Sequence, residues 1–396
     1  MKKFKLPKGF FANGIHCGVK RKRKDLVLLY SEKACKIAAI FTKNVVKAAP
    51  VILAIKQLKK NKPIRGVVIN SGNANCMTGK RGMEDAKKMT VEMAKILRVH
   101  KDEILVSSTG IIGEFMDMRP ITKGMKEIVK GLSADGTQDA AEGIMTTDRF
   151  PKISERTFTI GGKKIKMVGI AKGAGMIKPD MATMLCYILT DANISKKALK
   201  VALSESAEKS FNSVSVDGDM STNDTVQLLA NGLAGNVMIK EKGKDFENFK
   251  KNLNSISDEL AKMIVLDGEG ANKFVEVKVK KAKTKADAKK IAEAVASSLL
   301  VKCAVLGGDP NWGRVASSAG ASGVNFNPDK IEIILDGVVY FKNGKTLPHE
   351  NRKRSSVFKG KDVKIEVSLN AGKAEASFFS CDISKKYITL NSYYTT

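Results

Sequence analysis

The sequence predicts a mixed α/β (α+β) protein in which helices pack against mixed β-sheets. Short apolar runs that end in glycine-bearing turns alternate with longer segments whose apolar residues recur at helical spacing. Near the C-terminus, apolar runs are joined by Asp-Gly and Asn-Gly pairs, which are typical of β-hairpins. The chain has 396 residues, of which 43% are hydrophobic. This length is enough for two or more domains with cores of their own.

Three strands and one helix are predicted in the first half of the chain. The apolar runs Arg65–Asn75, Asp102–Glu114 and Met167–Gly173 each indicate a strand that leads into a glycine-bearing turn or loop. The segment Gly82–Val99 indicates a helix, because its apolar residues recur three or four positions apart.

One strand and one helix follow in the middle of the chain. The run Thr183–Leu189 is apolar enough to form a buried strand. The segment Ile194–Phe211 is predicted to be a helix that begins after Ser195, because a serine hydroxyl can accept a hydrogen bond from a backbone N–H of the first turn.

The composition changes near residue 280, which indicates a domain boundary. The basic stretch Lys278–Lys290 is interpreted as a strand end, a surface turn and the start of a helix that continues through Leu300. Within residues 330–345, the pairs Asp336-Gly337 and Asn343-Gly344 predict hairpin turns. We therefore expect an N-terminal domain over residues 1–280 and a smaller C-terminal α/β domain over residues 281–396.

The charge of the chain is strongly positive, with a formal net charge of +28. Such a charge attracts nucleic acid or anionic substrates. The lysines are scattered over the chain, aromatics make up only 6%, and we find no RNP-like or zinc-finger pattern. We therefore favour a lysine-rich surface that assists anionic substrates, and expect no nucleic-acid partner.

The six cysteines form no CxxC pair and do not stand at metal-ligand spacing to the three histidines. We interpret them as reduced thiols and expect a cytoplasmic protein without a metal. No apolar run is long enough to span a bilayer, and the basic N-terminus lacks the apolar region of a secretory signal. A membrane partner is therefore not expected.

A threonine stands where a glycine-rich loop becomes an apolar run, at Ala182-Thr183 in "KGAGMIKPDMATMLCYILTD". A threonine hydroxyl is a weak nucleophile unless a base is near, and the α-amine of an N-terminal threonine can be that base. This arrangement needs a chain break before Thr183, and the small Ala182 leaves the carbonyl approachable. By itself, however, the pattern favours an ordinary strand residue, because threonine is common in strands.

Other glycine- and acid-rich stretches carry weaker signals. "DGDMSTND" (217–224) has neither the glycine nor the glutamate of an EF-hand loop, and we interpret it as a hydrogen-bonded turn that could line a site. "GGDP" and "AKGAG" match neither phosphate-loop pattern. "SSTG", which ends at Gly110, is either a simple strand-to-loop turn or an oxyanion hole that pairs the Thr109 hydroxyl with a glycine N–H.

The chain resembles the ornithine acetyltransferases, also called bifunctional glutamate N-acetyltransferases, over nearly its whole length. The motifs occur in the family's order: "GFFANGIHCGVK" (9–20), "NSGNANCMTG" (70–79), "SSTGIIGE" (107–114), "GIMTTD" (143–148), the stretch around Thr183, "SVDGDMSTNDTVQLLANG" (215–232), "GEGANKF" (268–274), "GGDPNWGR" (307–314) and "YITLNSYYTT" (387–396). So many motifs in one order make the resemblance specific.

This resemblance implies a self-cleaving acetyltransferase of arginine biosynthesis with a layered helix–sheet–sheet–helix sandwich. The family cuts before the threonine that matches Thr183, which gives fragments 1–182 and 183–396, and two copies of each fragment assemble. Thr183 would carry acetyl from N2-acetylornithine to glutamate in a ping-pong reaction. Some members also use acetyl-CoA as donor, and no cofactor is implied.

The resemblance also implies roles for individual residues. Thr109 and Gly110 match the oxyanion hole, and the substrate-binding positions correspond to Thr146, Lys172, Thr183, Glu269, Asn391 and Thr396. Sequence reasoning does not separate Thr146 from its neighbour Thr147. A solvated lysine, a turn glutamate and a frayed C-terminal tail are the non-functional alternatives for the others.

One departure from the family's pattern and one alternative function remain. Arg149 follows "TTD" where many members have a smaller residue, so the chain departs from the family's pattern next to Thr146. The alternative function is that of a related self-cleaving aminopeptidase or amidase, in which water accepts the acyl group. Lys172, Glu269 and the C-terminal Asn391 and Thr396 favour the acetyltransferase.

Overall fold

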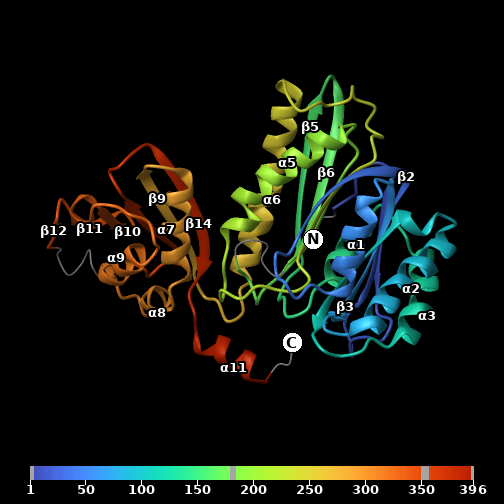
Figure 1. The fold of residues 1–396 in the computed structure, drawn as a ribbon, viewed down its shortest axis with the longest axis horizontal. Helices are drawn as coiled ribbons and strands as arrows, with labels where there is room; N and C mark the ends of the chain where they lie inside the picture. The colour runs from blue at the N-terminus through green and yellow to red at the C-terminus, as the bar shows by residue number, and fades with distance from the viewer. Residues whose placement is uncertain (1–3, 179–183, 349–355, 394–396) are drawn as a thin grey trace.

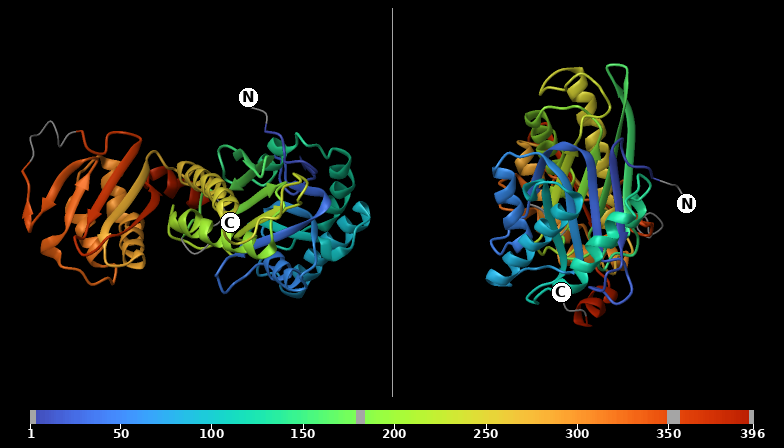
Figure 2. Two further views of the ribbon diagram at one scale, coloured as in Figure 1. Left: turned by 90° about the horizontal axis from the view of Figure 1, so that it is seen from above. Right: turned by 90° about the vertical axis from the view of Figure 1, so that its right-hand side faces the viewer.

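The computed structural model describes residues 4–178, 184–348 and 356–393, which form two β-sheets with their helices (Figure 1). The larger sheet has eight strands in the order β4-β3-β2-β8-β7-β6-β5, and β1 pairs with β2. The smaller sheet has six strands in the order β12-β11-β10-β13-β9-β14. Viewed from above, the two sheets lie in separate lobes of an elongated molecule (Figure 2).

The strands of the larger sheet all lie between residues 10 and 230. They are β1 (Phe10–Ile15), β2 (Leu26–Phe41), β3 (Ile64–Asn73), β4 (Ile104–Ile111), β5 (Lys152–Ile160), β6 (Lys163–Lys172), β7 (Leu185–Thr190) and β8 (Thr225–Ala230). The helices that contact these strands are α1 (Ala49–Lys59), α2 (Gly79–Leu97), α3 (Met118–Lys130), α4 (Thr137–Gly143), α5 (Lys196–Lys209) and α6 (Lys244–Leu266).

The long strand β2 divides the larger sheet into two layers. Its first part pairs with β3, and after an irregularity between Tyr30 and Cys35 its second part pairs with β8. Alternation along each strand then directs one set of side chains between the layers and the other set outward. On β7, Tyr187 is buried between the layers, whereas Ile188 packs in the core beneath α5 and α6.

The opposite layer follows the same rule. On β3, Val67 is buried between the layers, and Val68 packs in the core that α2 and α3 cover. The order is therefore helices, sheet, sheet and helices. This arrangement confirms the mixed α/β class and the layered sandwich that the resemblance implied.

The smaller sheet has its own core and its own helices. Its strands are β9 (Phe274–Ala282), β10 (Glu332–Leu335), β11 (Val338–Lys342), β12 (Lys345–Thr346), β13 (Asp362–Ser368) and β14 (Ala374–Cys381). Helices α7 (Lys285–Ser297), α8 (Leu299–Gly307) and α9 (Trp312–Gly320) lie beside it, and α11 (Lys385–Tyr393) follows β14. The expected boundary at residues 280/281 falls inside β9, so we propose to place the division between α6 and β9.

Helix α11 leaves the smaller sheet and returns beneath the larger one (Figure 1). None of its side chains is buried in the protein. It is attached at its N-terminal end, where Ser384 donates a hydrogen bond to the carbonyl of Gly270 at 2.6 Å. The C-terminal segment therefore reaches the loop that follows α6.

Most of the predicted elements are confirmed by the structure. The strands predicted over 65–75, 102–114, 167–173 and 183–189 correspond to β3, β4, β6 and β7. The predicted helices 82–99 and 194–211 correspond to α2 and α5, and the Ser195 hydroxyl accepts a hydrogen bond from the N–H of Ala198 at 3.0 Å. Both predicted hairpin turns are present, with positive φ at Asp336 and Asn343.

One predicted helix is wrong in its length. The sequence pattern predicted a single helix through Leu300, but α7 ends at Ser297 and α8 begins at Leu299. Ser298 has an extended backbone conformation, with ψ of 118°, and its side chain caps α8. Helical periodicity continues through this serine, so the sequence pattern alone did not reveal the break.

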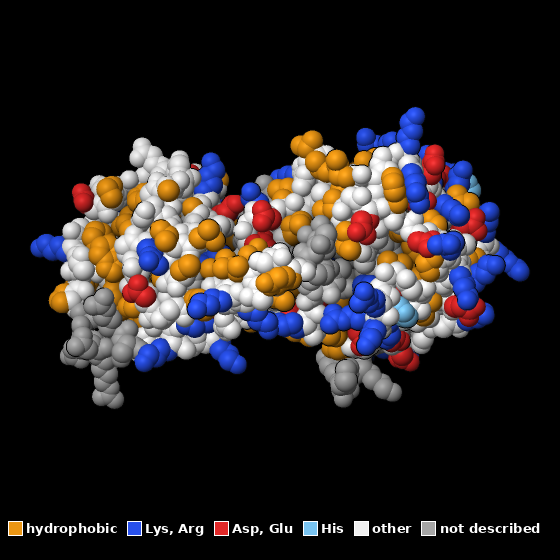
Figure 3. Space-filling view, turned by 90° about the horizontal axis from the view of Figure 1, so that it is seen from below, with side chains coloured by type: hydrophobic (Ala, Val, Ile, Leu, Met, Phe, Trp, Pro, Cys, Tyr) orange, Lys and Arg blue, Asp and Glu red, His pale blue; other side chains and the backbone are white. Residues whose placement is uncertain are grey.

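The surface carries positive charge on both halves of the molecule (Figure 3). On the face seen from below, Lys and Arg side chains alternate with hydrophobic and uncharged areas and do not form one continuous stripe. All six cysteines are free thiols, and Cys303 is the exposed one. Within the described residues, no helix is both long and apolar enough to cross a membrane.

Candidate active site

A pocket lies where β4 and β6 end, at the edge of the larger sheet. It is lined by Thr109, Gly110, Ile112, Thr146, Thr147, Lys172, Gly175, Met176, Asp217, Asp219, Ser221, Thr222, Asn223, Glu269, Tyr387 and Asn391. Every site residue predicted from the sequence that the structure describes is in this set. Ala182, Thr183 and Thr396 lie outside the described residues, so their predicted roles remain predictions.

Gly110 is at the end of β4 in a conformation that only glycine adopts easily. Its φ is +133°, and a Cβ at this position would lie 2.3 Å from the carbonyl carbon of Gly72 and 2.5 Å from the nitrogen of Asn73. Strand β3 therefore packs directly against the Gly110 backbone. This close approach fixes the position of the Thr109–Gly110 backbone at the pocket.

Asn223 braces the same strand end from the other side. Its side-chain amide donates hydrogen bonds to the carbonyls of Ala74 and Ser108, at 2.7 and 2.8 Å. The Thr222 hydroxyl in turn donates to the Asn223 side-chain oxygen at 2.6 Å. The "DGDMSTND" turn thus lines the pocket and holds β4 in place.

Lys172 ends β6 and points its ammonium group at Thr109. Its Nζ donates a hydrogen bond to Thr109 Oγ1 at 3.2 Å, and the side chain is buried. Burial lowers the pKa of Lys172 below its usual value, and the carboxylates of Asp148 and Asp224 only partly oppose this. Because the Thr109 hydroxyl accepts from Lys172, its own hydrogen stays available for another acceptor.

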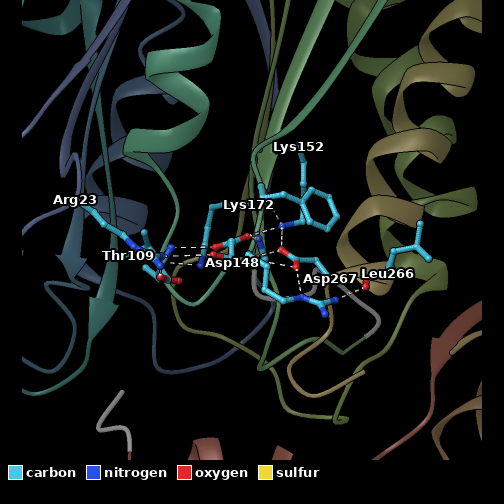
Figure 4. Close-up of polar contacts among 11 residues, drawn as sticks. Arg23, Thr109, Asp148, Lys152, Lys172, Leu266 and Asp267 are labelled. Carbon is cyan, nitrogen blue, oxygen red and sulfur yellow. Dashed lines mark hydrogen bonds and ion pairs between the residues drawn. The ribbon is translucent and has the colours of Figure 1, made fainter. Parts of the chain in front are cut away.

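A buried ionic network supports Lys172 from behind (Figure 4). Lys152 Nζ lies 2.6 Å from Asp148 and 2.6 Å from Asp267, and all three side chains are fully buried. Asp148 also accepts a hydrogen bond from the N–H of Gly173 at 2.7 Å. Desolvation opposes ionisation of Asp148, but its two lysine neighbours and these hydrogen bonds hold its pKa well below the usual range.

Arg149, where the chain departs from the family's pattern, belongs to this network. Its Nε lies 2.8 Å from Asp267, and its Nη2 donates to the carbonyl of Leu266 at 2.7 Å. The residue therefore joins the loop after α4 to the end of α6. Its guanidinium is directed at Asp267 and is absent from the pocket lining.

Thr146 and Thr147 both line the pocket, so the structure does not separate them. The N–H of Thr146 donates to Asp148 at 2.9 Å, which fixes this turn to the buried network. Arg23 Nη1 donates to the Thr146 carbonyl at 3.2 Å from the outside.

The two segments that flank the predicted cleavage position are held beside the pocket. On the near side, Asp217 accepts hydrogen bonds from the N–H groups of Met176 and Ile177, at 2.5 and 2.8 Å. On the far side, the N–H of Met184 donates to the buried Asp224 at 3.0 Å. Leu185 then pairs with Lys172 in the sheet. Met184, the residue after Thr183, therefore lies at the same edge of the sheet as Lys172.

Glu269 closes the pocket together with the C-terminal helix. The Asn391 side-chain amide donates a hydrogen bond to Glu269 Oε2 at 2.9 Å. A Cβ on Gly175 would lie 2.5 Å from the Glu269 carboxylate, so a side chain at position 175 would displace this carboxylate. Positions 269 and 391, which are 122 residues apart in the sequence, thus meet at the pocket.

Several residues at this site were not singled out from the sequence. Asp148, Lys152 and Asp267 form the ionic network, and Asp217 and Tyr387 line or brace the pocket. Asp148, Asp217 and Tyr387 lie inside quoted motifs and Asp267 directly precedes "GEGANKF", whereas Lys152 lies in none of the motifs. Within the described ranges, no three His, Cys, Asp or Glu side chains are grouped so as to hold a metal ion.

Comparison with known proteins gives full-length relatives. A model of the ArgJ family matches residues 11–396. The chain is 45% identical to the arginine biosynthesis bifunctional protein ArgJ of Caldanaerobacter subterraneus subsp. tengcongensis, covering 100% of this chain and 98% of that protein. It is 46% identical to the glutamate N-acetyltransferase of Methanocaldococcus jannaschii, covering 98% of each.

A solved structure agrees with these relatives. The crystal structure of arginine biosynthesis bifunctional protein argJ from Bacillus halodurans matches with a TM-score of 0.51 at 36% identity, covering 52% of this chain and 98% of that chain. The family model and the full-length relatives extend over nearly every residue that forms the sandwich, the pocket and the C-terminal helix. The chain therefore belongs to the ArgJ family.

Proposed function

We propose that the chain cuts itself between Ala182 and Thr183 and then transfers acetyl from N2-acetylornithine to glutamate, with Thr183 as the acyl-carrying nucleophile. The observation that carries this proposal is the meeting of Thr109, Gly110, Lys172, Glu269 and Asn391 at one pocket, beside Met184. Membership of the ArgJ family and the name of the Methanocaldococcus jannaschii relative support the same reaction.

The cut supplies the base that the reaction needs. Once Thr183 is N-terminal, its α-amine has an ordinary pKa of about 7.7–8.0 and can take the proton of the hydroxyl. The Met184 N–H bonded to Asp224 holds the chain at this point. The Bacillus halodurans chain corresponds to only 52% of this one, a length that suits one fragment of a divided relative.

In the first half-reaction, the Thr183 hydroxyl oxygen attacks the acetyl carbon of N2-acetylornithine. The developing oxyanion would be stabilised by the Thr109 hydroxyl, whose oxygen already accepts from Lys172, and by the Gly110 backbone N–H. The carbon–nitrogen bond breaks, the proton passes to the leaving nitrogen, and ornithine departs. Glu269 has the charge to bind the side-chain ammonium of ornithine.

In the second half-reaction, the α-amine of glutamate attacks the acetyl ester on Thr183. The ester bond breaks, the Thr183 hydroxyl recovers its proton, and N-acetylglutamate leaves. Lys172 and Thr146 or Thr147 would hold the α-carboxylate that both substrates share, since all three line the pocket. Acetyl-CoA as a second donor is part of this proposal, because the Caldanaerobacter relative is named bifunctional.

We also propose a cytoplasmic enzyme that assembles from two copies of each fragment. Six free thiols suit a reducing compartment. The exposed apolar side chains Ile388 and Tyr393 of α11, which are 63% and 89% exposed, would be covered in such an assembly.

Intact mass of the purified protein, before and after brief incubation with N2-acetylornithine, tests the reaction. We expect two fragments that meet at Ala182-Thr183, with the second fragment gaining one acetyl group that glutamate then removes. Thr183→Ala should remain one chain without acetyl, and the matched Thr183→Ser should still be cut and acetylated because it keeps the hydroxyl.

A single wild-type chain that never takes up acetyl would refute the proposal. Release of acetate, with no N-acetylglutamate formed in the presence of glutamate, would instead favour the alternative aminopeptidase or amidase.

A further inference from the structure

A second compartment opens next to the candidate active site. It is lined by Arg23, Thr146, Thr147, Glu269, Leu390 and Asn391. All of these except Arg23 and Leu390 also line the inner pocket, so the two spaces adjoin. A substrate held at Lys172 and Thr109 can therefore extend its side chain into this outer compartment.

Arg23 is carried by a loop that a buried carboxylate holds in place. The loop joins β1 to β2, and Asp25, which is fully buried, accepts hydrogen bonds from the N–H groups of Cys17 and Lys20 at 2.6 and 2.8 Å. Lys20 Nζ also donates to the carbonyl of Met145 at 2.6 Å, which ties the loop to the turn before Thr146. The position of Arg23 is therefore set by the fold.

The guanidinium of Arg23 is fixed on one edge and free on the other. Its Nη1 donates to the carbonyls of Thr146 and Asp148, at 3.2 and 3.4 Å (Figure 4). Among the described residues, neither its Nε nor its Nη2 has a hydrogen-bond partner, and no carboxylate is paired with it. Nε and Nη2 form the fork that binds a carboxylate through two parallel hydrogen bonds.

The same compartment also carries a negative charge. Glu269 presents its carboxylate there, oriented by the hydrogen bond from Asn391. Leu390 adds an apolar surface suited to methylene groups. One compartment thus offers an anion, a cation with a free fork and an apolar wall.

We propose that Arg23 is the specificity-determining residue for the acceptor, binding the side-chain carboxylate of glutamate, while Glu269 binds the side-chain ammonium of the donor. This inference rests on the proposed ping-pong reaction, in which two substrates with the same α-groups use one site in turn. Their side chains have opposite charges, so a single compartment must serve both. Arg23 and Glu269 meet this requirement, because both line the compartment and each substrate finds its counter-charge on a different one of them.

The two half-reactions can be measured separately, so each charge can be tested with its own substrate. Acetyl-enzyme is formed with N2-acetylornithine, freed of donor, and its loss is followed by intact mass at increasing glutamate or glutamine. In Arg23→Gln, we expect KM for glutamate to rise about 10- to 100-fold, because two charge-assisted hydrogen bonds are lost. The rate of acetylation by N2-acetylornithine should stay within about twofold of wild type, because a positive charge at position 23 does not bind the positively charged donor side chain.

Three controls sharpen the result. Glutamine is the neutral counterpart of glutamate, so the preference for glutamate over glutamine should fall in Arg23→Gln by the same factor. Arg23→Lys keeps the charge but loses the fork of two donors, so its KM for glutamate should lie between those of wild type and Arg23→Gln. Arg21→Gln removes an equal charge from an exposed residue of the same loop that lines neither compartment, and should leave both half-reactions unchanged.

The outcomes separate this inference from the reaction on which it rests. If wild-type protein is acetylated and deacetylated normally, but Arg23→Gln keeps the glutamate preference or slows both half-reactions equally, Arg23 is only structural and the inference is wrong. If the wild-type chain takes up no acetyl, the proposed function itself is refuted, and this inference with it.

Discussion

Adding one methyl group at Gly110 should test the proposed oxyanion hole, because it displaces the end of β4 and should lower the rate of acetylation. In Gly110→Ala the new Cβ would lie 2.3 Å from the Gly72 carbonyl carbon, and ordinary contact begins at 3.4 Å. Both partners are backbone atoms of β3, so the end of β4 must shift by about 1 Å. Such a misplacement in an active site costs about 100-fold in rate, and loss of an oxyanion donor costs about 100- to 1,000-fold.

Gly113→Ala is the matched control for this change. Gly113 also has a positive φ, of +86°, but a Cβ there meets nothing within 4 Å. Gly113→Ala therefore introduces the same kind of backbone strain without displacing β3. Both variants are compared by the rate at which the cut fraction of protein is acetylated by N2-acetylornithine, with circular dichroism as the check on folding. Acetylation of Gly110→Ala within about threefold of Gly113→Ala would refute the assignment of Gly110.

Three further predictions concern the support of the site. Asp267→Ala removes one of the two carboxylates paired with Lys152 and the carboxylate paired with Arg149. It should cost about 3–5 kcal/mol of stability, seen as a lower thermal midpoint. The double variant with Lys152→Met should lose less than the sum of the single changes, and strict additivity would contradict the network. Asp217→Ala frees the N–H groups of Met176 and Ile177 and should slow the appearance of the two fragments on a gel at least about 10-fold, whereas Asp245→Ala, an exposed residue of α6, should not. Burial lowers the pKa of Lys20 to about 8, against 10.5 in the unfolded chain. Between these pH values the unfolded chain binds more protons than the folded chain. The stability of the folded chain should therefore rise with pH across this window. The difference in thermal midpoint between Lys20→Met and wild type should therefore shift in favour of the variant from pH 10 to pH 7. An equal difference at both pH values would argue against a partly buried cation at this position.

The sequence predicted those parts of the fold and the site that depend on local patterns, such as strand ends and helix caps. Strand-to-glycine transitions placed Thr109 near the end of β4 and Lys172 at the end of β6. The two strands lie in different layers, and their ends meet where Lys172 Nζ donates a hydrogen bond to Thr109 Oγ1. Ser195 was predictable because a cap acts within its own helix turn. The resemblance supplied Glu269 and Asn391, which no local pattern could have joined across 122 residues.

What the sequence did not reveal depends on long-range packing. Asp148 and Asp267 share Lys152 although one of them is 115 residues away, and a buried aspartate looks like any other in a sequence. The break at Ser298 was hidden because both flanking helices have apolar residues at helical spacing. The boundary expected at residue 280 falls inside β9, because the basic composition begins within this strand, where lysines alternate with buried valines.

The strand order of the larger sheet has a consequence for the order of events in the life of this protein. Strands β6 and β2 precede Ala182-Thr183, strands β7 and β8 follow it, and the sheet places them as β2-β8-β7-β6. A scission at this point would remove one covalent link and leave both fragments hydrogen-bonded within one sheet and one shared core. Neither fragment could complete that sheet alone. If the proposed cut occurs, the chain would have to fold as a single polypeptide first and be divided afterwards. Fragments that later unfolded would have to find each other in a bimolecular encounter that the newly made protein never faces.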